Sequence, residues 1–374
     1  MWPLKWKKRE ENYRQARAGF FEAVKLLDRR SFLGVAGRAA TIATAKAIVP
    51  PHSFQLVDVL GVGLREKPAF RFAYIADTHL YERTLNERFV AAAMRAVNDI
   101  NALKPPPDFV LVGGDLAQFG QPKELELGKQ ILSELKAPLK MVAGEHDWYL
   151  DLGEKWQELF GPPNYSFHHK GVHFIGLMSV NEKDFWTDRK MTPLERMKTV
   201  AQLDSPIQSR FEVGEAGREW LRQALAKVPN DTPIVLMTHA PLYKYYRPWN
   251  FWTEDADLVQ EILFPYRSVT VLHAHTHQVL THRVKNIHFH GMLATSWPWP
   301  YAPEGLPKLT VKMDRVDPFD QLDGLGSGTV DVYGSGYVNK HYSLWRRDPI
   351  TVAKAYLESW GKEAIPRSPE FPSY

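Results

Sequence analysis

Carboxylate and imidazole side chains follow five apolar stretches of this sequence, each at the point where the apolar run stops. The run Met141–Gly144 ends in glycine, and Glu145, His146 and Asp147 follow at once. Polar side chains directly after a buried strand lie at the edge of a sheet, where α/β proteins place their ligands. The five stretches span residues 73–79, 110–115, 141–147, 235–239 and 271–277, and their polar residues include Asp77, His79, Asp115, Glu145, His146, Asp147, His239, His275 and His277.

These side chains are suited to binding metal ions. The sequence contains no cysteine, so only nitrogen and oxygen donors are available, and such donors favour Zn, Mn or Fe. Two cations that lie close together need a carboxylate that bridges them and several further ligands each. His275 and His277 are two residues apart and would face opposite sides of a strand, so the chain must turn here for both to reach one centre.

Each stretch on its own has an ordinary explanation. Asp-x-His is common in loops, Gly-Gly-Asp is common in turns, and a lone histidine after a strand is more often hydrogen-bonded at a sheet edge than bound to a metal. Five such stretches in one chain, each ending an apolar strand, favour a metal site over five unrelated loops. The other histidines nearby are interpreted as structural, and they are His168, His169, His173, His273, His282, His288 and His290.

The elements expected around these stretches alternate between strands and helices, which is typical of sheets covered by helices. Strands are expected at residues 70–76, 108–112, 138–143, 232–238 and 268–272, and helices at 84–104, 122–135, 215–228 and 256–264. Two hairpins are expected, one turning at Lys170–Gly171 and one at Lys285–Asn286. Residues 182–214 show no clear period and are interpreted as a lid or rim loop.

The five stretches together resemble a known family. The motifs, in chain order, are Asp77-Thr78-His79, Gly113-Gly114-Asp115, Gly144-Glu145-His146-Asp147, Thr238-His239 and Ala274-His275-Thr276-His277. They resemble the motifs of the calcineurin-like metallophosphoesterases, nearest the branch of cyclic-nucleotide phosphodiesterases, over about Phe70 to Ser296. The resemblance implies an α/β fold, a four-layer αββα sandwich of two mixed sheets, with a dinuclear metal centre.

The resemblance also implies a role for each candidate residue. The implied reaction is attack on the phosphorus of a phosphate mono- or diester by a hydroxide bound to two metal ions, which would be Fe, Mn or Zn. Asp77, His79 and His277 would hold the first ion, Asp115 would bridge, and Glu145, His239 and His275 would hold the second ion. His146 would stand near the leaving oxygen as general acid or electrostatic stabiliser. Apart from the resemblance, Asp147 is expected to orient its neighbour His146 by hydrogen bonding.

Glu145 is the main departure from the family pattern, which has a neutral Asn at this position. Glutamate keeps an oxygen donor but adds a methylene group and a negative charge. Either Glu145 still binds the second ion, tuning the choice of metal or favouring less charged diesters, or its longer side chain displaces that ion and leaves a slow or silent site. The second outcome fits an alternative function, an accessory or structural subunit of a membrane-surface complex. Ala274, where the family has Gly, adds slight crowding beside His275.

The first 50 residues are interpreted as a leader. Residues 1–47 carry 11 Lys and Arg against four Asp and Glu, which leaves 36 basic and 39 acidic residues in the rest of the chain. The stretch Asp28–Gly34, with its Arg29–Arg30 pair, resembles a twin-arginine export signal, and the apolar run after it is too short and too charged for a stable transmembrane helix. We therefore expect a periplasmic protein, membrane-associated if the leader stays attached. The alternative is a surface helix that contains an arginine pair by chance.

The chain is expected to have three parts: the leader at 1–50, a metallophosphoesterase domain at 68–299, and a C-terminal extension at 300–374 that packs on the core. The near-neutral body shows no basic stripe for nucleic acid. A cluster of aromatic residues would stack a base or an aromatic leaving group, form a packed rim, or contact a protein partner. The cluster comprises Tyr243, Tyr245, Tyr246, Trp249, Phe251 and Trp252, with Trp297 and Trp299 similar in kind. The C-terminal extension is a second candidate surface for a protein partner.

Overall fold

The computed structural model describes most of the middle of the chain. The described residues are 67–81, 87–181, 191–200, 211–245, 252–298, 322, 324–334, 336, 338–345 and 350–353. All of them except Lys67 belong to one compact unit, Pro68–Ala353. The expected leader at residues 1–50, with its twin-arginine motif, lies outside the described residues, and so does the whole segment 299–321.

The first sheet has six strands in the order β12-β11-β10-β1-β2-β3. Strands β1, β2 and β3 run parallel, and two helices connect them on one face of the sheet. Strands β10, β11 and β12 are antiparallel and extend the sheet beyond β1. The elements are β1 (Phe70–Ile75), α4 (Glu87–Asn101), β2 (Val110–Val112), α5 (Pro122–Leu132), β3 (Leu139–Met141), β10 (Gly326–Val332), β11 (Val338–Leu344) and β12 (Ile350–Ala353).

The second sheet also has six strands, in the order β4-β5-β6-β7-β9-β8. Its centre is parallel, from β5 through β6 and β7 to β9, and the outer strands β4 and β8 are antiparallel to their neighbours. The elements are β4 (Tyr165–His169), β5 (Val172–Gly176), α10 (Gly214–Leu225), β6 (Ile234–Thr238), α11 (Ala256–Leu263), β7 (Val269–His273), β8 (Thr281–Val284) and β9 (Ile287–Gly291).

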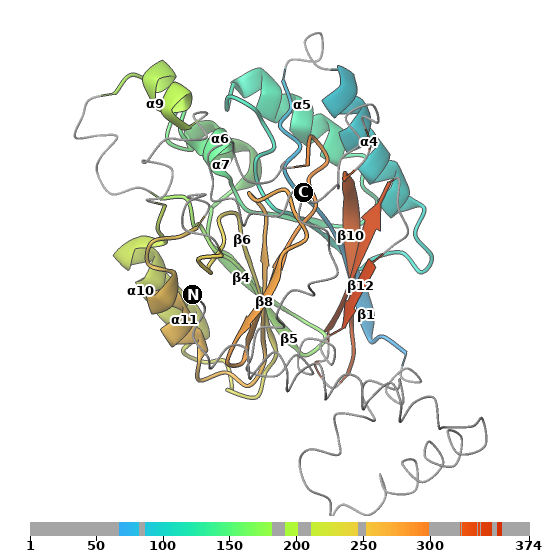
Figure 1. The fold of residues 1–374 in the computed structure, drawn as a ribbon, viewed down its shortest axis with the longest axis vertical. Coiled ribbons are helices and arrows are strands. Elements are labelled where there is room, and N and C mark those ends of the chain that lie inside the picture. The colour runs from blue at the N-terminus through green and yellow to red at the C-terminus, as the bar shows by residue number, and fades with distance from the viewer. Residues whose placement is uncertain are drawn as a thin grey trace, which may run out of the picture. The chain divides into compact units, whose positions relative to one another are not determined.

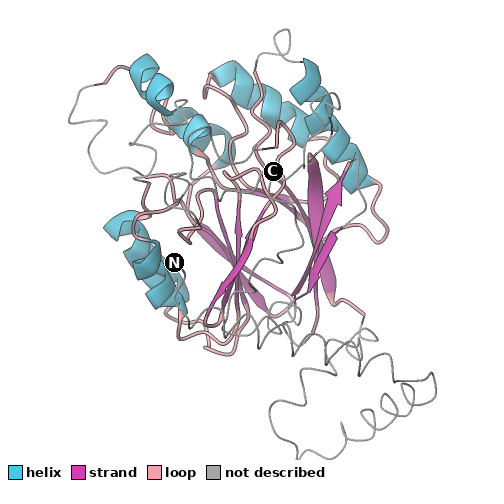
Figure 2. Cartoon of the chain, viewed as in Figure 1, coloured by secondary structure: helices cyan, strands magenta, loops and turns pink. Residues whose placement is uncertain are grey.

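The two sheets face each other, and each carries helices on its outer side (Figures 1 and 2). Helix α4 buries Val90, Val97 and Ile100 against the outer face of the first sheet, because its apolar residues recur every three or four positions. Helices α10 and α11 cover the second sheet in the same way. Aromatic side chains fill the space between the sheets, where the rings of Phe72 and Phe174 lie 5.5 Å apart. The expected fold, an α/β sandwich of two mixed sheets, is confirmed.

Both expected hairpins are present. β4 and β5 turn at Lys170–Gly171, and β8 and β9 turn at Lys285–Asn286, with positive φ at Lys170, Gly171 and Lys285. Three short helices were not predicted, namely α6 (Glu145–Trp148), α7 (Glu154–Phe160) and α9 (Pro193–Val200). They are one or two turns long, and a hydrophobic period cannot be recognised over so few residues.

The compact unit extends past residue 299, where the sequence suggested a boundary. Strand β10 pairs with β1 over Phe70–Tyr74, so a segment from the C-terminal part of the chain lies in the middle of the first sheet. Side chains of β10 are buried along its whole length. The described strands beyond 299 are therefore an integral part of the sheet. The sequence did not show this because β-strand pairing between distant segments leaves no local pattern.

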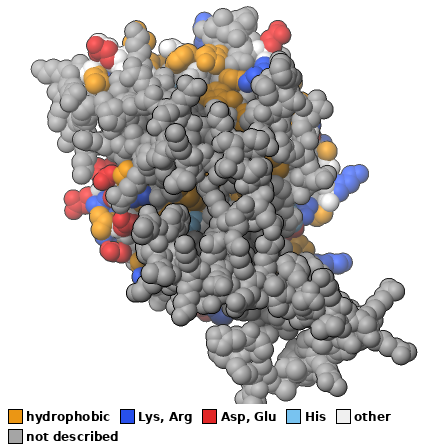
Figure 3. Space-filling model, viewed as in Figure 1, with side chains coloured by type: hydrophobic (Ala, Val, Ile, Leu, Met, Phe, Trp, Pro, Cys, Tyr) orange, Lys and Arg blue, Asp and Glu red, His pale blue; other side chains and the backbone are white. Residues whose placement is uncertain are grey.

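The surface of the described residues mixes both signs of charge. On the face shown in Figure 3, acidic and basic side chains of the described part lie next to one another. Among the described helices, none has the length and apolar character needed to span a membrane.

Removing the C-terminal strands tests the extended boundary. A chain that stops at residue 299 lacks β10, so β1 becomes an unpaired edge strand with a buried side-chain face. We expect this chain to aggregate or to lose cooperative thermal unfolding, measured by circular dichroism. A matched chain that stops at residue 353 keeps all three strands and should unfold cooperatively. Equal melting of the two truncated chains would contradict the assignment.

Candidate metal centre

The fold brings the five predicted stretches to one place. The loops after β1, β2 and β3 leave the same edge of the first sheet, because these strands are parallel, and the loops after β6 and β7 leave the corresponding edge of the second. Backbone hydrogen bonds join neighbouring loops: the N–H of Asp77 donates to the carbonyl of Gly114 (3.1 Å), and that of Ala274 to the carbonyl of His239 (3.0 Å). The site is therefore built across both sheets.

The backbone at this site is held in a conformation that most residues avoid. Of eight non-glycine residues with positive φ in the described part of the chain, five are candidate ligands: Asp77 (51°), His79 (44°), Asp115 (49°), His275 (65°) and His277 (49°). Left-handed backbone costs about 1–3 kcal/mol at a non-glycine residue, and it persists mainly where function requires it. The expected turn at His275 and His277 is confirmed, and it lets both imidazoles enter one cluster.

Glycines allow the loops to approach closely. A Cβ atom at Gly144 would lie 2.0 Å from Asp115 Oδ1, and one at Gly114 would lie 2.6 Å from His239 Nδ1. Gly114 also has a φ of +96°, which other residues rarely adopt. The glycines that precede Asp115 and Glu145 in the sequence are thus needed for space as well as for backbone conformation.

Asp77, His79 and His277 form the first group of candidate ligands. One ligand atom from each lies within 4.8 Å of the others, and all three residues are at most 3% exposed. His79 Nδ1 faces the amide oxygen of Gln118 (2.8 Å), and His277 Nδ1 faces the carbonyl oxygen of Trp297 (2.8 Å). Both Nδ1 atoms are therefore positioned to donate, and the two Nε2 atoms face each other at 3.1 Å.

Asp115, Glu145, His239 and His275 form the second group, also within 4.8 Å of one another. His239 Nδ1 donates to the carbonyl of Gly113 (2.7 Å), so its Nε2 faces Glu145 Oε2 at 2.9 Å and Asp115 Oδ2 at 3.2 Å. Glu145 Oε1 lies 2.8 Å from His275 Nδ1. The longer side chain of Glu145 therefore places both carboxylate oxygens within the cluster.

The two groups meet at Asp115. Its Oδ2 lies 3.5 Å from His79 Nε2 in the first group and 3.2 Å from His239 Nε2 in the second. One buried carboxylate oxygen here, Asp77 Oδ2, has no hydrogen-bond partner among the described residues, and Glu145 Oε2 faces only the ring nitrogen of His239. Buried acceptors without donors are costly, and a cation satisfies several of them at once. The residues thus fit a binuclear metal site, with Asp115 between the two groups.

The protonation of these groups reflects the burial of opposite charges. Burial opposes the cationic form of His239, but the carboxylates of Asp115 and Glu145 outweigh it and raise the pKa of His239 well above its ordinary value. Burial also opposes ionisation of Glu145, yet the imidazoles of His275 and His239 hold its pKa well below the usual range. Burial and two neighbouring imidazoles lower the pKa of His79 far below its ordinary value. The neutral His79 ring can therefore offer a nitrogen lone pair to a metal ion.

His146 lies beside both groups and is fixed by the chain. Its Nδ1 donates to the carbonyl oxygen of Gln118 (2.6 Å), and its backbone N–H donates to Asp115 Oδ1 (3.1 Å). At 9% exposed, it is the most accessible of the candidate residues. Burial opposes its charge, but the carboxylates of Asp115 and Glu145 raise its pKa above the ordinary value.

Asp147 does not orient His146, which corrects the role expected for it. Its two oxygens accept backbone N–H groups instead, Oδ1 from Ala117 (2.9 Å) and Oδ2 from Gly144 (3.0 Å). The His146 ring is held by Gln118. Asp147 is the third residue of helix α6, so its carboxylate reaches back to the start of that helix. It ties the loop after β2 to the loop after β3.

Gln118 and the backbone of Trp297 are positioning groups that the sequence did not reveal. Gln118 holds two histidines at once, His79 through its side-chain oxygen and His146 through its carbonyl oxygen. Trp297 accepts from His277 and also packs against it and against His79, with ring centroids 5.0 and 4.1 Å apart. The sequence signal for the role of Gln118 is only that a polar residue follows Asp115 by three positions. The role of the Trp297 carbonyl has no sequence signal, because every residue has a backbone carbonyl.

None of the histidines interpreted as structural belongs to the two groups of candidate ligands. His273 is buried and bonds to the carbonyl of Ala274 (3.1 Å) and to the hydroxyl of Tyr245 (3.0 Å). Burial, the largest influence, lowers its pKa to about 4. His168, His169, His173, His282, His288 and His290 lie on β4, β5, β8 and β9, as expected.

The aromatic cluster after His239 is only partly described. Tyr243 stacks on His282 at 3.9 Å and packs against the second sheet together with Tyr245. These two side chains form a packed rim, one of the alternatives raised above. Trp252 lies under the ammonium group of Lys244 at 4.9 Å. The other members, Tyr246, Trp249 and Phe251, and also Trp299, lie outside the described residues.

Comparisons with known proteins agree with this geometry. A family model described as calcineurin-like phosphoesterase matches residues 70–279. A dimetal phosphatase from Danio rerio has the same fold, with a TM-score of 0.51 over 77% of this chain and 99% of that chain. At 13% sequence identity, this likeness concerns the fold alone.

Two curated relatives match in sequence. A probable glycerophosphodiester phosphodiesterase from Arcobacter nitrofigilis is 26% identical over 174 residues, which cover 45% of this chain and 56% of that protein. A probable cyclic nucleotide phosphodiesterase from Rhodopseudomonas palustris is 28% identical over 179 residues, which cover 46% of this chain and 57% of that protein. The chain thus spans less than two thirds of the length of these relatives.

Replacing Gln118 tests whether it positions the donors. Gln118→Leu puts a shorter apolar side chain at this buried position and removes the oxygen that faces His79 Nδ1. We expect metal affinity, measured by competition with a chelating dye, to fall by roughly 10- to 100-fold, as is typical when a residue supporting a metal ligand is lost.

Gln260→Leu is the matched control. Gln260 is also buried, and its amide donates to the carbonyl of Leu242 (2.7 Å) in another part of the fold. This variant should lose stability but bind metal as before. Equal metal affinity in Gln118→Leu and the unchanged chain would show that Gln118 is not a positioning residue.

Proposed function

The chain belongs to the calcineurin-like phosphoesterase family, and we propose that it is a metal-dependent phosphoric ester hydrolase with two metal ions. One observation carries this proposal: Asp115 Oδ2 lies within 3.5 Å of an imidazole from each of two buried donor groups. In each group an imidazole donates its Nδ1 proton to an oxygen and turns Nε2 to the cluster. This arrangement supports metal binding over an ordinary hydrogen-bonded network.

In this proposal seven residues hold the two ions. Bound cations would polarise the phosphoryl oxygens and lower the pKa of water, and the N and O donors suit Fe, Mn or Zn. Asp77, His79 and His277 would hold the first ion, Glu145, His239 and His275 would hold the second, and Asp115 would contact both. The neutral state of His79 leaves its lone pair available for this purpose.

His146 would act as the general acid. Because its Nδ1 is bound to the carbonyl of Gln118, only Nε2 can exchange a proton with substrate. Its pKa, raised by the carboxylates of Asp115 and Glu145, keeps the ring protonated over a wider pH range than usual. A protonated imidazole next to the leaving oxygen stabilises the negative charge that develops there and then donates the proton.

Glu145 would bias the site toward diesters. With Glu145, the two groups together contain three carboxylates, those of Asp77, Asp115 and Glu145. The Asn of the family pattern would leave two. The additional negative charge repels a monoester dianion more than a diester monoanion. Trp297, which covers His79 and His277, would form an apolar wall for an ester substituent. Two of the curated relatives are described as phosphodiesterases, which also supports this preference.

The charge of Glu145 can be separated from its length by two substitutions. Glu145→Gln removes only the charge, and Glu145→Asn also shortens the side chain. If charge sets the preference, both variants should hydrolyse p-nitrophenyl phosphate faster relative to bis(p-nitrophenyl) phosphate, by about tenfold, which equals about 1.4 kcal/mol of barrier. The ratio of kcat/KM for the two substrates is the measurement.

A third variant and the metal content complete this test. His146→Gln should slow esters of poor leaving groups more than nitrophenyl esters, because nitrophenolate needs little protonation.

If both Glu145 variants keep the parental ratio, Glu145 does not set the preference. A metal-loaded chain inert toward all these esters would instead favour the alternative, an accessory subunit of a membrane-surface complex.

We also propose that residues 1–50 direct export through the twin-arginine route, which gives a periplasmic location. The support is the Arg29–Arg30 pair, followed by Phe32, Leu33 and a run rich in small residues. A reporter fused to residues 1–50 should be exported in a bacterial host, and Arg29→Lys with Arg30→Lys should abolish export. Export that survives the double substitution would refute this assignment.

A further inference from the structure

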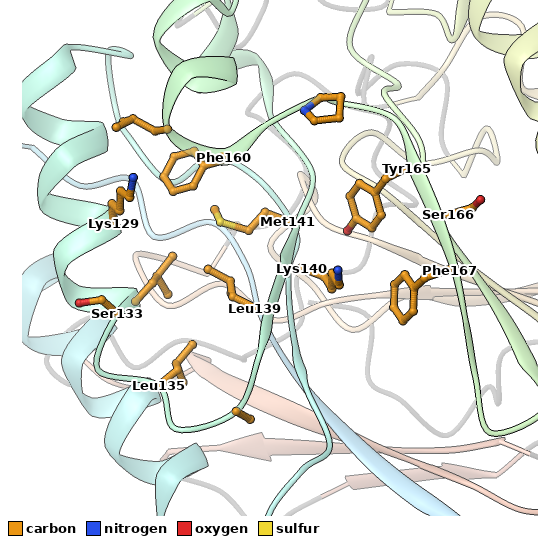
Figure 4. A pocket seen from close by; sticks show the side chains of 14 residues that line it. Lys129, Ser133, Leu135, Leu139, Lys140, Met141, Phe160, Tyr165, Ser166 and Phe167 are labelled. Carbon is orange, nitrogen blue, oxygen red and sulfur yellow. The ribbon is translucent and has the colours of Figure 1, made fainter.

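A groove lies on the side of the compact unit, where both sheets end. It has a volume of about 570 Å³, and it is bounded by α5, α7 and the edge strands β3 and β4 (Figure 4). None of the candidate metal ligands lines it. The groove is thus separate from the metal centre and is not explained by the proposed hydrolysis.

The edge of β3 presents unpaired backbone groups to this groove. In a parallel ladder, alternate residues of a strand bond to the neighbouring strand. The carbonyl of Pro138 and the N–H of Val142 bond to residues of β2. By this alternation, the N–H and C=O groups of Lys140, which lies between them, also face β2. The N–H and C=O groups of Leu139 and Met141 therefore point away from β2, and no described residue bonds to them. Such an edge can accept another strand.

The two sides of the groove differ in chemistry. On the side of α5 and α7, Leu135, Leu139, Met141 and Phe160 form an apolar wall (Figure 4). On the side of β4, the Lys140 ammonium lies over the ring of Phe167 at 5.0 Å and near that of Tyr165 at 6.0 Å. Because successive side chains of a strand point to opposite sides, a strand added to β3 would meet these two surfaces alternately.

The charges in the groove are of one sign. Lys129 and Lys140 are its only charged lining residues, and neither forms an ion pair with a carboxylate of the described chain. The groove therefore complements an anionic side chain. Pairing with a second copy of this chain through β3 would place the two Lys140 side chains near each other, and like charges on paired strands are destabilising.

We propose that this groove binds an extended segment of a partner protein, which adds to β3 as a strand. The segment has apolar residues at every second position, facing α5 and α7, and an acidic residue between them that pairs with Lys140. Main-chain hydrogen bonds to Leu139 and Met141 hold the segment, and the alternating side chains select it. This inference does not depend on the metal centre or its chemistry.

Fluorescein-labelled peptides test this proposal on the full chain. A peptide of alternating Val and Glu should bind with saturation below about 1 mM, measured by fluorescence polarisation. Lys140→Glu should weaken this peptide roughly tenfold and strengthen a peptide of alternating Val and Lys, because the charge of the groove is reversed. Lys227→Glu is the matched control, since it makes the same change of charge on an exposed residue outside the groove, and it should leave both affinities unchanged.

Backbone-modified peptides separate strand addition from simple charge attraction. Two versions of the Val/Glu peptide carry N-methyl groups on its odd or on its even amides, so each has one blocked edge. Strand addition predicts that only one version loses binding, because only one edge of the peptide faces β3. Equal binding of both versions overturns the proposal, as does an affinity that Lys140→Glu does not change.

Self-association is the competing outcome. A chain that is dimeric by light scattering, with a dimer that Lys140→Glu alters, would show that a second copy occupies the groove and would overturn the proposal. Absence of saturable binding of the Val/Glu peptide to the monomeric chain would do the same. The melting temperature of Lys140→Glu, compared with that of Lys227→Glu, shows whether the variant is folded.

Discussion

Buried negative charge is the constraint on which the rest of this structure depends. Three carboxylates, those of Asp77, Asp115 and Glu145, lie within one cluster and are at most 4% exposed. Proton sharing with His239 can offset part of this charge, but the neutral His79 faces another imidazole nitrogen at 3.1 Å. A surplus of buried carboxylate is unfavourable unless cations lie among these side chains. The left-handed backbone at five candidate ligands is a further cost, and such strain is found mainly at functional sites.

The fold brings these residues together from distant parts of the chain. Parallel strands in both sheets deliver their loops to one edge, and His239 Nδ1 joins the second sheet to the first through the carbonyl of Gly113. The C-terminal strand β10 supports this arrangement from the other side of β1. The edge groove beside β3 uses a different part of the same sheet, since it lies along the strand that leads to Glu145. Hydrolysis and partner binding could therefore occur on one rigid unit.

Much of this arrangement could be predicted from the sequence, because its signal is local. Apolar runs that end in Asp77, Asp115 or His239 showed both the strand and its chemistry. Three features escaped prediction because they depend on contacts between distant residues: the pairing of β10 with β1, the acceptor role of Gln118, and the use of the Asp147 carboxylate by two backbone N–H groups. Asp147 is the clearest example. Its position next to His146 in the sequence suggested a hydrogen bond between the two side chains, but the Asp147 carboxylate accepts backbone N–H groups instead.

The metal content of the purified chain tests the central claim most directly. Elemental analysis should find close to two transition-metal ions per chain, and Asp115→Asn should lose more than one of them, since its Oδ2 lies between both donor groups. An unchanged melting temperature after chelation, together with a metal content near zero in the folded chain, would contradict the account. The buried carboxylates would then have to be neutralised by protons alone.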